Sequence, residues 1–395
     1  MKQIFTNMYF IDGKNISNRD IFVSDGIICD EFEKDKDTKI IDCNGYVLVP
    51  SFVDLHAHFR DPGFTQKEDL KTGSLSALKG GYTTVNLMGN TKPTVSNPKV
   101  YEDIKKRAKD LDLIDIEQVY TITKDFDGKT LSHLDDIDSS VKFISDDGKG
   151  VNNDYIMYLA FKKAKEKNLN LTLHEEVMGL SKEDYDLAEN IMTIRDCYLS
   201  YKLNQKVHFS HVSTKDAIRA IEFFKNLGAN ITCEVTPHHL YFSDRNDLRV
   251  NPPIRREEDR IELIEMIKRG IVDCISTDHA PHTKKDKLNG APGYIGLETA
   301  FSICYESLVL SGNISLNHLI ELMSTNPSKI LKINKGRIKK GYEADFTLID
   351  LNDSFTYTED MIASKSKNSP YIGKKLHGRI LRVYKKGILK YEYNR

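Results

Sequence analysis

The stretch YVLVPSFVDLHAHFR, residues 46–60, decides how the rest of the sequence is interpreted. Its apolar and β-branched residues are typical of a buried strand. Side chains two residues apart point to the same face of a strand, so His56 and His58 are expected to lie side by side where this strand ends. Paired imidazoles suit a borderline metal ion such as zinc. An H-x-H pattern alone is not specific, and the interpretation depends on whether other strands also end in ligands.

Composition excludes several classes of protein. The chain has 395 residues, of which 39% are hydrophobic, and its 57 basic and 58 acidic residues nearly balance. That balance gives no sign of a nucleic-acid-binding surface. The six cysteines form no C-x-x-C pair, which favours a reducing compartment. The amino terminus, MKQIFTN, lacks the apolar core of a signal peptide, and no run reaches membrane-spanning length. We therefore expect a soluble, cytoplasmic protein without nucleic-acid or membrane partners.

Strand-like and helix-like segments alternate through the middle of the chain. Strands are predicted near residues 47–58, 83–90, 116–123, 141–145, 170–174, 206–211, 231–236 and 271–278. Amphipathic helices are predicted at residues 98–110, 153–167, 214–227 and 257–269. This alternation predicts an α/β protein, a (β/α)8 TIM barrel of parallel strands. A doubly wound open sheet is the alternative, because periodicity cannot show closure.

The two ends of the sequence have a different character. Both contain short alternating runs, such as GIICD at residues 26–30 and GYEADFTLID at residues 341–350. We expect residues 1–48 and 336–395 to form one small β-sandwich domain, and residues 49–335 to form the barrel.

Polar side chains follow most of the predicted barrel strands, at the rim where such barrels carry their chemistry. The candidate metal ligands are His56, His58, Asp147, His174, His211 and Asp278. Their composition predicts a two-metal site, with His56, His58 and Asp278 around one ion, His174 and His211 around the other. Asp147 is the candidate carboxylate bridge, although a turn is the ordinary explanation of Asp146-Asp147-Gly148. Two such ions share a water and convert it to hydroxide at neutral pH.

The remaining histidines are expected to lie outside the ligand set. His133, His318 and His377 occur in polar or helical surroundings. His208 is three residues before His211 and is expected to face the opposite side of its strand. His238 and His239 are adjacent and cannot both point inward, although one could orient a ligand.

The sequence resembles the cyclic amidohydrolases of the amidohydrolase superfamily, and most closely the bacterial dihydroorotases of class I. The resemblance covers essentially the whole chain. Its motifs are DLHAHFRDPG (54–63), GGYTTV (80–85), DDG (146–148), EVTPHHL (234–240), NPP (251–253), TDHAPH (277–282) and GLETA (296–300).

The resemblance assigns the six candidate ligands above to metal positions and implies two zinc ions per chain. It also implies that Arg60, Asn90 and His282 bind a substrate carboxylate and that Asn251 contacts a pyrimidine ring, with His58 counted among the substrate contacts as well. A planar guanidinium offers a bidentate fork to a carboxylate, which lysine cannot reproduce. A surface ion pair with Asp61 is the ordinary alternative for Arg60.

The reaction that the resemblance implies is the reversible closure of N-carbamoyl-L-aspartate to L-dihydroorotate, with a metal-bridging hydroxide as nucleophile and Asp278 as the catalytic acid–base. The alternatives are another cyclic amidohydrolase, such as a hydantoinase or allantoinase, or a non-catalytic scaffold relative. A carboxylated Lys142 is the second candidate for the metal bridge. The resemblance also allows a homodimer or an assembly with aspartate transcarbamoylase.

Overall fold

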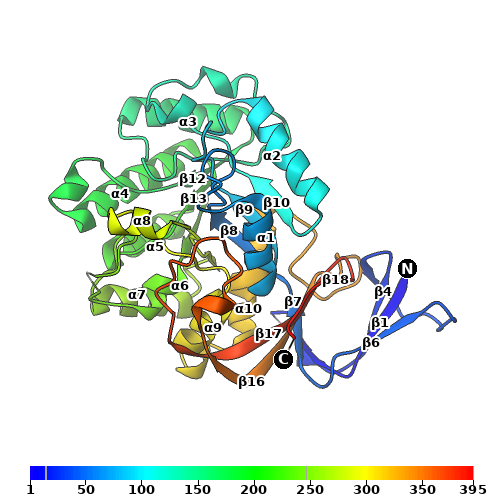
Figure 1. Ribbon diagram of the computed structural model, residues 1–395. Helices are drawn as coiled ribbons and strands as arrows, with labels where there is room; N and C mark the ends of the chain where they lie inside the picture. The colour runs from blue at the N-terminus through cyan, green and yellow to red at the C-terminus, as the bar shows by residue number, and fades with distance from the viewer. Residues whose placement is uncertain (14–15, 246, 395) are drawn as a thin grey trace.

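The computed structural model describes residues 1–13, 16–245 and 247–394. Within these residues, parallel strands form the centre of the larger part of the molecule (Figure 1). One sheet has the order β10-β9-β8 and a second has the order β11-β12-β13-β14-β15. The strands are β8 (Phe52–Ala57), β9 (Tyr82–Leu87), β10 (Asp115–Gln118), β11 (Phe143–Ile144), β12 (Asn170–Leu173), β13 (Val207–Phe209), β14 (Ile231–Val235) and β15 (Cys274–Ile275).

Isolated parallel bridges join these two sheets at both of their edges. Tyr120 pairs with Ile144 on one side, and Ala57 pairs with His279 on the other. Every neighbouring pair of strands in both sheets is parallel. The strands are shorter than predicted, because the polar residues that close each predicted segment leave the ladder and line the rim.

The segment predicted as one strand over residues 47–58 is two strands. β7 (Val47–Pro50) pairs antiparallel with β16 (Phe346–Thr356), whereas β8 pairs with β9. Ser51 separates them, donating its backbone N–H to Asp345 and accepting from Ser324 Oγ. The chain therefore passes from one sheet to another at this residue.

The four predicted helices are present: α2 (Pro98–Leu111), α3 (Asp154–Glu166), α5 (Lys215–Asn226) and α7 (Glu257–Lys268). Side chains of Asn97, Asn153 and Thr214 cap the first three by accepting from backbone N–H groups. Shorter helices are α6 (Pro237–Tyr241), α8 (Lys284–Leu288), α9 (Ala300–Cys304), α10 (Leu316–Ile320) and α11 (Asn326–Leu331). No helix in the described part of the chain combines the length and apolar content needed to cross a bilayer.

Two long helices were not predicted, α1 (Leu70–Lys79) and α4 (Tyr185–Leu203). α4 is apolar on both faces: Ala188 and Met192 are buried, while Ile191 and Ile194 are exposed. A helix with apolar residues all round has no amphipathic period, so the pattern that identified the other helices is missing here.

The ends of the chain form two further sheets, drawn at the lower right of Figure 1 with both termini. The first has the order β5 (Ile27–Cys29), β4 (Ile21–Ser24), β1 (Lys2–Thr6), β6 (Lys39–Asp42). The second has the order β18 (Ile388–Glu392), β17 (Lys375–Lys385), β16, β7, β2 (Tyr9–Ile11), β3 (Ile16–Ser17). Both sheets contribute to one hydrophobic cluster, in which the Phe5 ring packs edge-on against Phe346 and Tyr384 at centroid distances of 5.1 and 5.0 Å.

A buried ammonium group ties the terminal sheets to the parallel strands. Lys335 is 6% exposed, and its Nζ donates to Asp115 at the start of β10, to Asp345 at 2.7 Å and to the Thr84 hydroxyl at 3.1 Å. Burying the Lys335 ammonium or the Asp345 carboxylate without an opposite charge beside it would cost free energy.

Replacing Lys335 with Met should therefore destabilise the fold by about 3–5 kcal/mol, because Asp345 would lose its buried counter-charge. Chemical denaturation followed by circular dichroism measures the change. The matched control is Lys340→Met, which removes an exposed ion pair with Asp30 and should cost less than about 1 kcal/mol. Equal losses in the two variants would contradict this account of the junction.

Candidate metal centre

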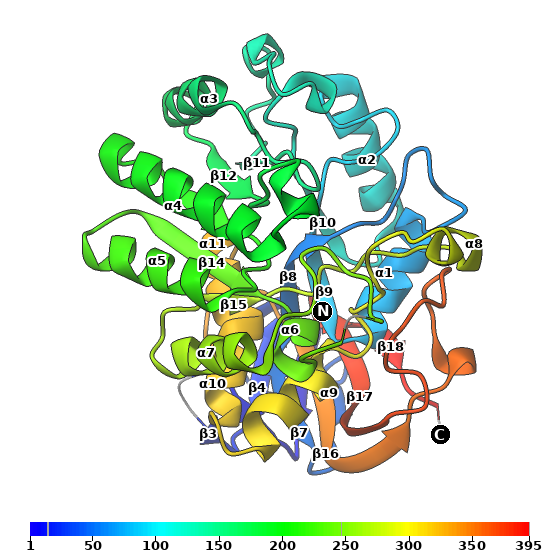
Figure 2. The same cartoon turned by 90° about the vertical axis from the view of Figure 1, so that its left-hand side faces the viewer.

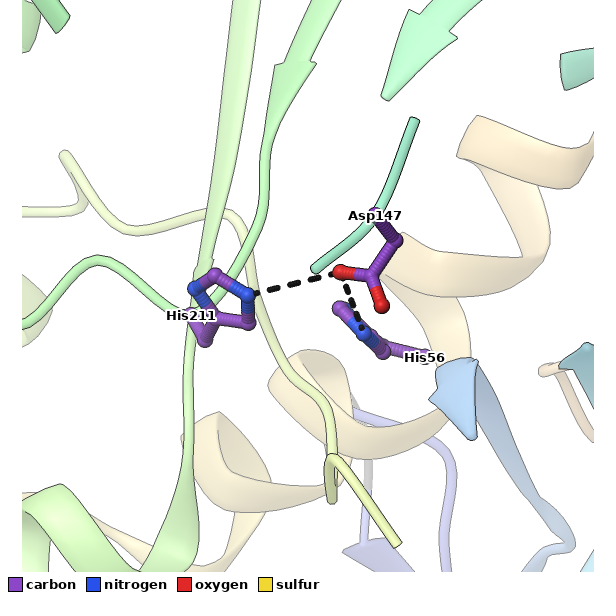
Figure 3. Close-up of side chains that lie close together, drawn as sticks. All are labelled: His56, Asp147 and His211. Atoms are coloured by element: carbon purple, nitrogen blue, oxygen red, sulfur yellow. Dashed lines mark ion pairs between the residues drawn. The ribbon is translucent and has the colours of Figure 1, made fainter. Parts of the chain in front are cut away.

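The six predicted ligands come together at the carboxyl ends of the parallel strands. His56 lies in β8 and His58 just after it, and Asp147, His174, His211 and Asp278 follow β11, β12, β13 and β15. All six are buried. Figure 3 shows His56, Asp147 and His211 pointing toward one another from separate elements, and Figure 2 gives the same strands in a second view.

The backbone is strained where the chain leaves these strands. His211 and Asp278 have φ values of 35° and 46°, and Arg60 has a φ of 58°. Side chains other than glycine rarely occupy this left-handed region, and such residues cluster at functional sites. The strain fixes the direction in which these three side chains leave the rim.

His56, His58 and Asp278 form the first group of donors. His58 Nε2 lies 3.2 Å and His56 Nε2 lies 3.7 Å from Asp278 Oδ1. Burial alone would raise the pKa of Asp278, but the contact with His58 and the charge of His56 outweigh it and hold the pKa below its usual range.

Asp147 connects this group to the second one. Its Oδ1 lies 3.3 Å from His56 Nε2 and 3.7 Å from both His174 Nδ1 and His211 Nε2, while its Oδ2 lies 3.5 Å from His58 Nε2. His174 Nδ1 and His211 Nε2 are themselves 3.0 Å apart. One carboxylate therefore faces both groups, as a ligand shared by two ions would.

In three histidines, the ring nitrogen that faces away from the centre makes a hydrogen bond. The lone pair of the other ring nitrogen then faces the centre. His56 Nδ1 donates to Glu234 Oε1 at 3.0 Å, His58 Nδ1 to Asn90 Oδ1 at 2.9 Å, and His174 Nε2 to Glu176 Oε2 at 3.0 Å. Because a carboxylate can only accept, the opposite ring nitrogens of His56 and His174 carry no proton when the rings are neutral. This arrangement is typical of metal-bound imidazoles.

Negative charge dominates the immediate surroundings of His56. Within the described residues, His56 Nε2 has no hydrogen-bond partner although it is fully buried. Burial alone would lower the pKa of His56, but the carboxylates of Asp147 and Glu234 outweigh it and raise the pKa well above its usual value. Buried lone pairs and carboxylates at such distances need cations between them, so the donor set fits divalent metal ions.

Glu234, in β14, was not predicted as a site residue. It is fully buried and accepts from His56, from His208 Nε2 at 3.0 Å and from the Ser276 hydroxyl. His208 is absent from the lining of the pocket above the ligands, but Glu234 connects its ring to His56. Alternation along a strand shows which side chains share a face, but it does not show which of them interact through a third residue.

Glu176 is the second residue that sequence reasoning missed. Its Oε2 accepts from His174 and, at 3.0 Å, from Asn251 Nδ2. The Tyr185 hydroxyl donates to Asn251 Oδ1. The amide of Asn251 is thus oriented by groups that also hold a candidate ligand. The H-x-E spacing from His174 was the one available signal.

The pocket above the ligands carries the predicted substrate contacts. It encloses about 200 Å³ and is lined by His58, Arg60, Asn90, Asn251 and His282 together with the candidate ligands Asp147, His174, His211 and Asp278. Arg60 Nη2 lies 3.3 Å from His282 Nε2. Burial, together with Arg60 and Lys67, lowers the pKa of His282 to about 3, so this ring is neutral at physiological pH. The ordinary alternative for Arg60, an ion pair with Asp61, does not occur among the described residues, where Asp61 pairs with Arg107.

Lys142 lies away from this pocket. Its Nζ forms an ion pair with Glu117 at 2.9 Å, at the opposite ends of the strands. This position favours Asp147 as the bridge. His133, His318 and His377 are absent from the pocket lining. His239 bonds to Thr236 and to the carbonyls of Pro252 and Pro253, while His238 Nε2 is buried without a hydrogen-bond partner in the described chain.

Comparison with solved structures identifies a shared fold. An L-hydantoinase from Arthrobacter aurescens superposes with a TM-score of 0.90 at 23% identity, covering 100% of this chain and 96% of its own. A dihydropyrimidinase from Brevibacillus agri gives 0.88 at 21% identity, covering 98% and 95%. At these identities the similarity shows the fold alone.

Comparison with curated sequences is more specific. A dihydroorotase from Clostridium botulinum is 48% identical over 99% of this chain and 100% of its own length. One from Aquifex aeolicus is 38% identical over 99% and 100%, and one from Streptococcus pneumoniae is 35% identical over 94% and 95%. These findings confirm the resemblance predicted from the motifs. Because the amidohydrolase family also matches residues 47–389, the chain belongs to that family.

Proposed function

We propose that this chain catalyses the dihydroorotase reaction, the reversible interconversion of N-carbamoyl-L-aspartate and L-dihydroorotate in pyrimidine biosynthesis. The near-complete match to dihydroorotases supports this function. The observation that carries it is that Arg60 lines the same pocket as five of the six candidate ligands, His58, Asp147, His174, His211 and Asp278. A pocket that combines hydrolytic ligands with a carboxylate-binding fork suits a cyclic amide that bears a carboxylate.

We further propose that the centre holds two zinc ions, with His56, His58 and Asp278 around one, His174 and His211 around the other, and Asp147 between them. When bound, such a pair acidifies a water molecule and polarises the carbonyl that it attacks. Imidazole and carboxylate oxygen are suitable donors for zinc.

The chain's own residues bind the substrate and transfer the proton. Arg60, Asn90 and His282 bind the carboxylate, Asn251 contacts the ring, and His58 serves both the metal and the substrate. In ring opening, water adds to the ring carbonyl carbon and the C–N bond breaks. Asp278 accepts the proton that the attacking water loses and delivers it to the departing nitrogen. Closure follows the same steps in reverse.

The proposal also covers the closure of the barrel and the domain formed by the two ends of the chain. We propose that the parallel strands close into a (β/α)8 barrel over residues 49–335, since bridges join both pairs of edges. Residues 1–48 and 336–395 then form the small β-sandwich around their shared cluster. A homodimer or an assembly with aspartate transcarbamoylase stays a prediction.

Replacing Arg60 with Gln should lower kcat/KM for dihydroorotate by about 100-fold or more, because the neutral amide cannot pair with the carboxylate. Zinc content should stay at the wild-type level, since Arg60 is not a ligand. Dihydroorotate absorbance follows turnover, and elemental analysis follows zinc. Exposed Arg256→Gln is the matched control and should behave as wild type. Normal turnover by the Arg60 variant would instead favour a hydantoinase-like activity.

Replacing Glu234 with Gln should weaken zinc binding by about 10- to 100-fold, because one face of the amide would present a donor to a ring nitrogen that must itself donate. Competition with a chelator measures the affinity. Glu117→Gln, which neutralises a carboxylate paired with Lys142 at the other strand ends, is the control. Unchanged zinc affinity in the Glu234 variant would remove its assigned role.

The two directions of the reaction should respond oppositely to pH. Ring opening needs the unprotonated water–Asp278 pair, so its kcat/KM should fall on the acid side. Closure needs the protonated pair and should fall on the alkaline side. Initial rates in both directions across the pH range measure this. Identical profiles would contradict Asp278 as the group that carries the proton.

A further inference from the structure

A second pocket lies at the end of the strands opposite to the metal centre. It encloses about 420 Å³, roughly the size of a small-molecule site. Asn170 begins β12, and Lys206, Asn230 and Asp273 immediately precede β13, β14 and β15. The candidate ligands follow the same strands, so the parallel sheet separates the two pockets.

The walls of this pocket carry excess positive charge. Lys206, Lys329 and Lys332 line it, and within the described ranges none of them forms an ion pair with a carboxylate. Lys206, more than any other neighbour, lowers the pKa of Lys332, and Lys142 adds to the effect. Ammonium groups gathered in this way repel one another, and an anion between them would relieve the repulsion.

The carboxylate in the lining does not supply that anion. Asp273 Oδ2 accepts from Lys225 Nζ at 2.5 Å and from the Cys233 backbone N–H at 2.8 Å. Its charge is therefore already compensated from outside the pocket, and the lysines of the wall are left facing solvent.

The rest of the lining is suited to the uncharged part of a small molecule. Phe143, Val207 and Ile330 form an apolar wall, and the amides of Asn170 and Asn230 can both donate and accept hydrogen bonds. A pocket with a cationic side, an apolar wall and neutral amides is complementary to a molecule that carries phosphate on a polar, partly planar body.

We propose that this pocket binds an organic phosphate, with its phosphate groups between Lys206 and Lys332 and its body against Phe143 and Ile330. This binding is distinct from the proposed catalytic function, because the described residues that line this pocket and those that line the pocket above the ligands do not overlap. His208 lines this pocket and is connected to His56 through Glu234.

Calorimetric titration of the zinc-loaded, full-length protein tests the proposal with ATP, inorganic pyrophosphate and adenosine as probes. ATP should bind more tightly than pyrophosphate, and adenosine should bind weakest. The double variant Lys206→Gln/Lys332→Gln should weaken ATP binding by about tenfold or more, because two charge-assisted contacts are lost. The affinity should also fall as salt is added.

Two controls locate the binding. The double variant Lys71→Gln/Lys106→Gln removes the same charge from exposed positions on α1 and α2 and should leave ATP affinity unchanged. Arg60→Gln should also leave it unchanged, because that residue lines the metal pocket. Failure of ATP to bind, equal affinity for ATP and pyrophosphate, or loss of binding in the Arg60 variant instead of the lysine variant would each overturn the proposal.

Discussion

Two buried carboxylates at the rim of the parallel strands need positive charge nearby, and the surrounding structure depends on this need. Asp147 and Asp278 lie among imidazole nitrogens whose lone pairs point inward, and no lysine or arginine forms an ion pair with either carboxylate within the described chain. An uncompensated buried carboxylate is expensive. The groups around these aspartates leave room for cations that would offset the free-energy cost of burying the carboxylates. The strained backbone and the surrounding hydrogen bonds hold the imidazole rings in the tautomer and orientation that such cations need.

Hydrogen bonds from neighbouring residues fix the orientation of the candidate ligands. Glu234 and Glu176 each accept from the outer nitrogen of a histidine, and Asn90 does the same for His58 while donating to Asp147. These groups fix both the tautomer and the direction of each ring. Asn90 and Asn251 also line the pocket above the ligands. Asn90 contacts the candidate ligands His58 and Asp147 directly, whereas Asn251 is connected to His174 through Glu176.

Strand alternation and motif spacing were sufficient to predict that the six candidate ligands come together, because each of them lies at or just after the end of a predicted strand. The same reasoning could not find α4, whose apolar residues occur on both faces. It joined β7 and β8 into one strand, because the switch between sheets at Ser51 depends on pairing with β16, some 300 residues later in the chain. It also could not show that His208 is connected to His56, since that connection depends on Glu234 in a neighbouring strand. The strand boundary at Ser51 and the link through Glu234 share one cause: each depends on contacts between segments distant in sequence.

Several polar side chains hydrogen-bond to one another within the parallel sheet. Glu234, His208 and Ser276 occupy positions in the sheet that apolar side chains would ordinarily fill, and a well-packed apolar replacement is often as stable as a buried charged group or more so. Their contribution is therefore better explained by the orientation of His56 than by stability. Because His208 also lies 2.8 Å from Thr232 Oγ1 in the lining of the opposite pocket, this chain of hydrogen bonds is a continuous polar contact between the two ends of the strands. A shift of the His208 ring would alter the hydrogen bond that Glu234 makes with His56, and through it the direction of a ring that faces the metal centre.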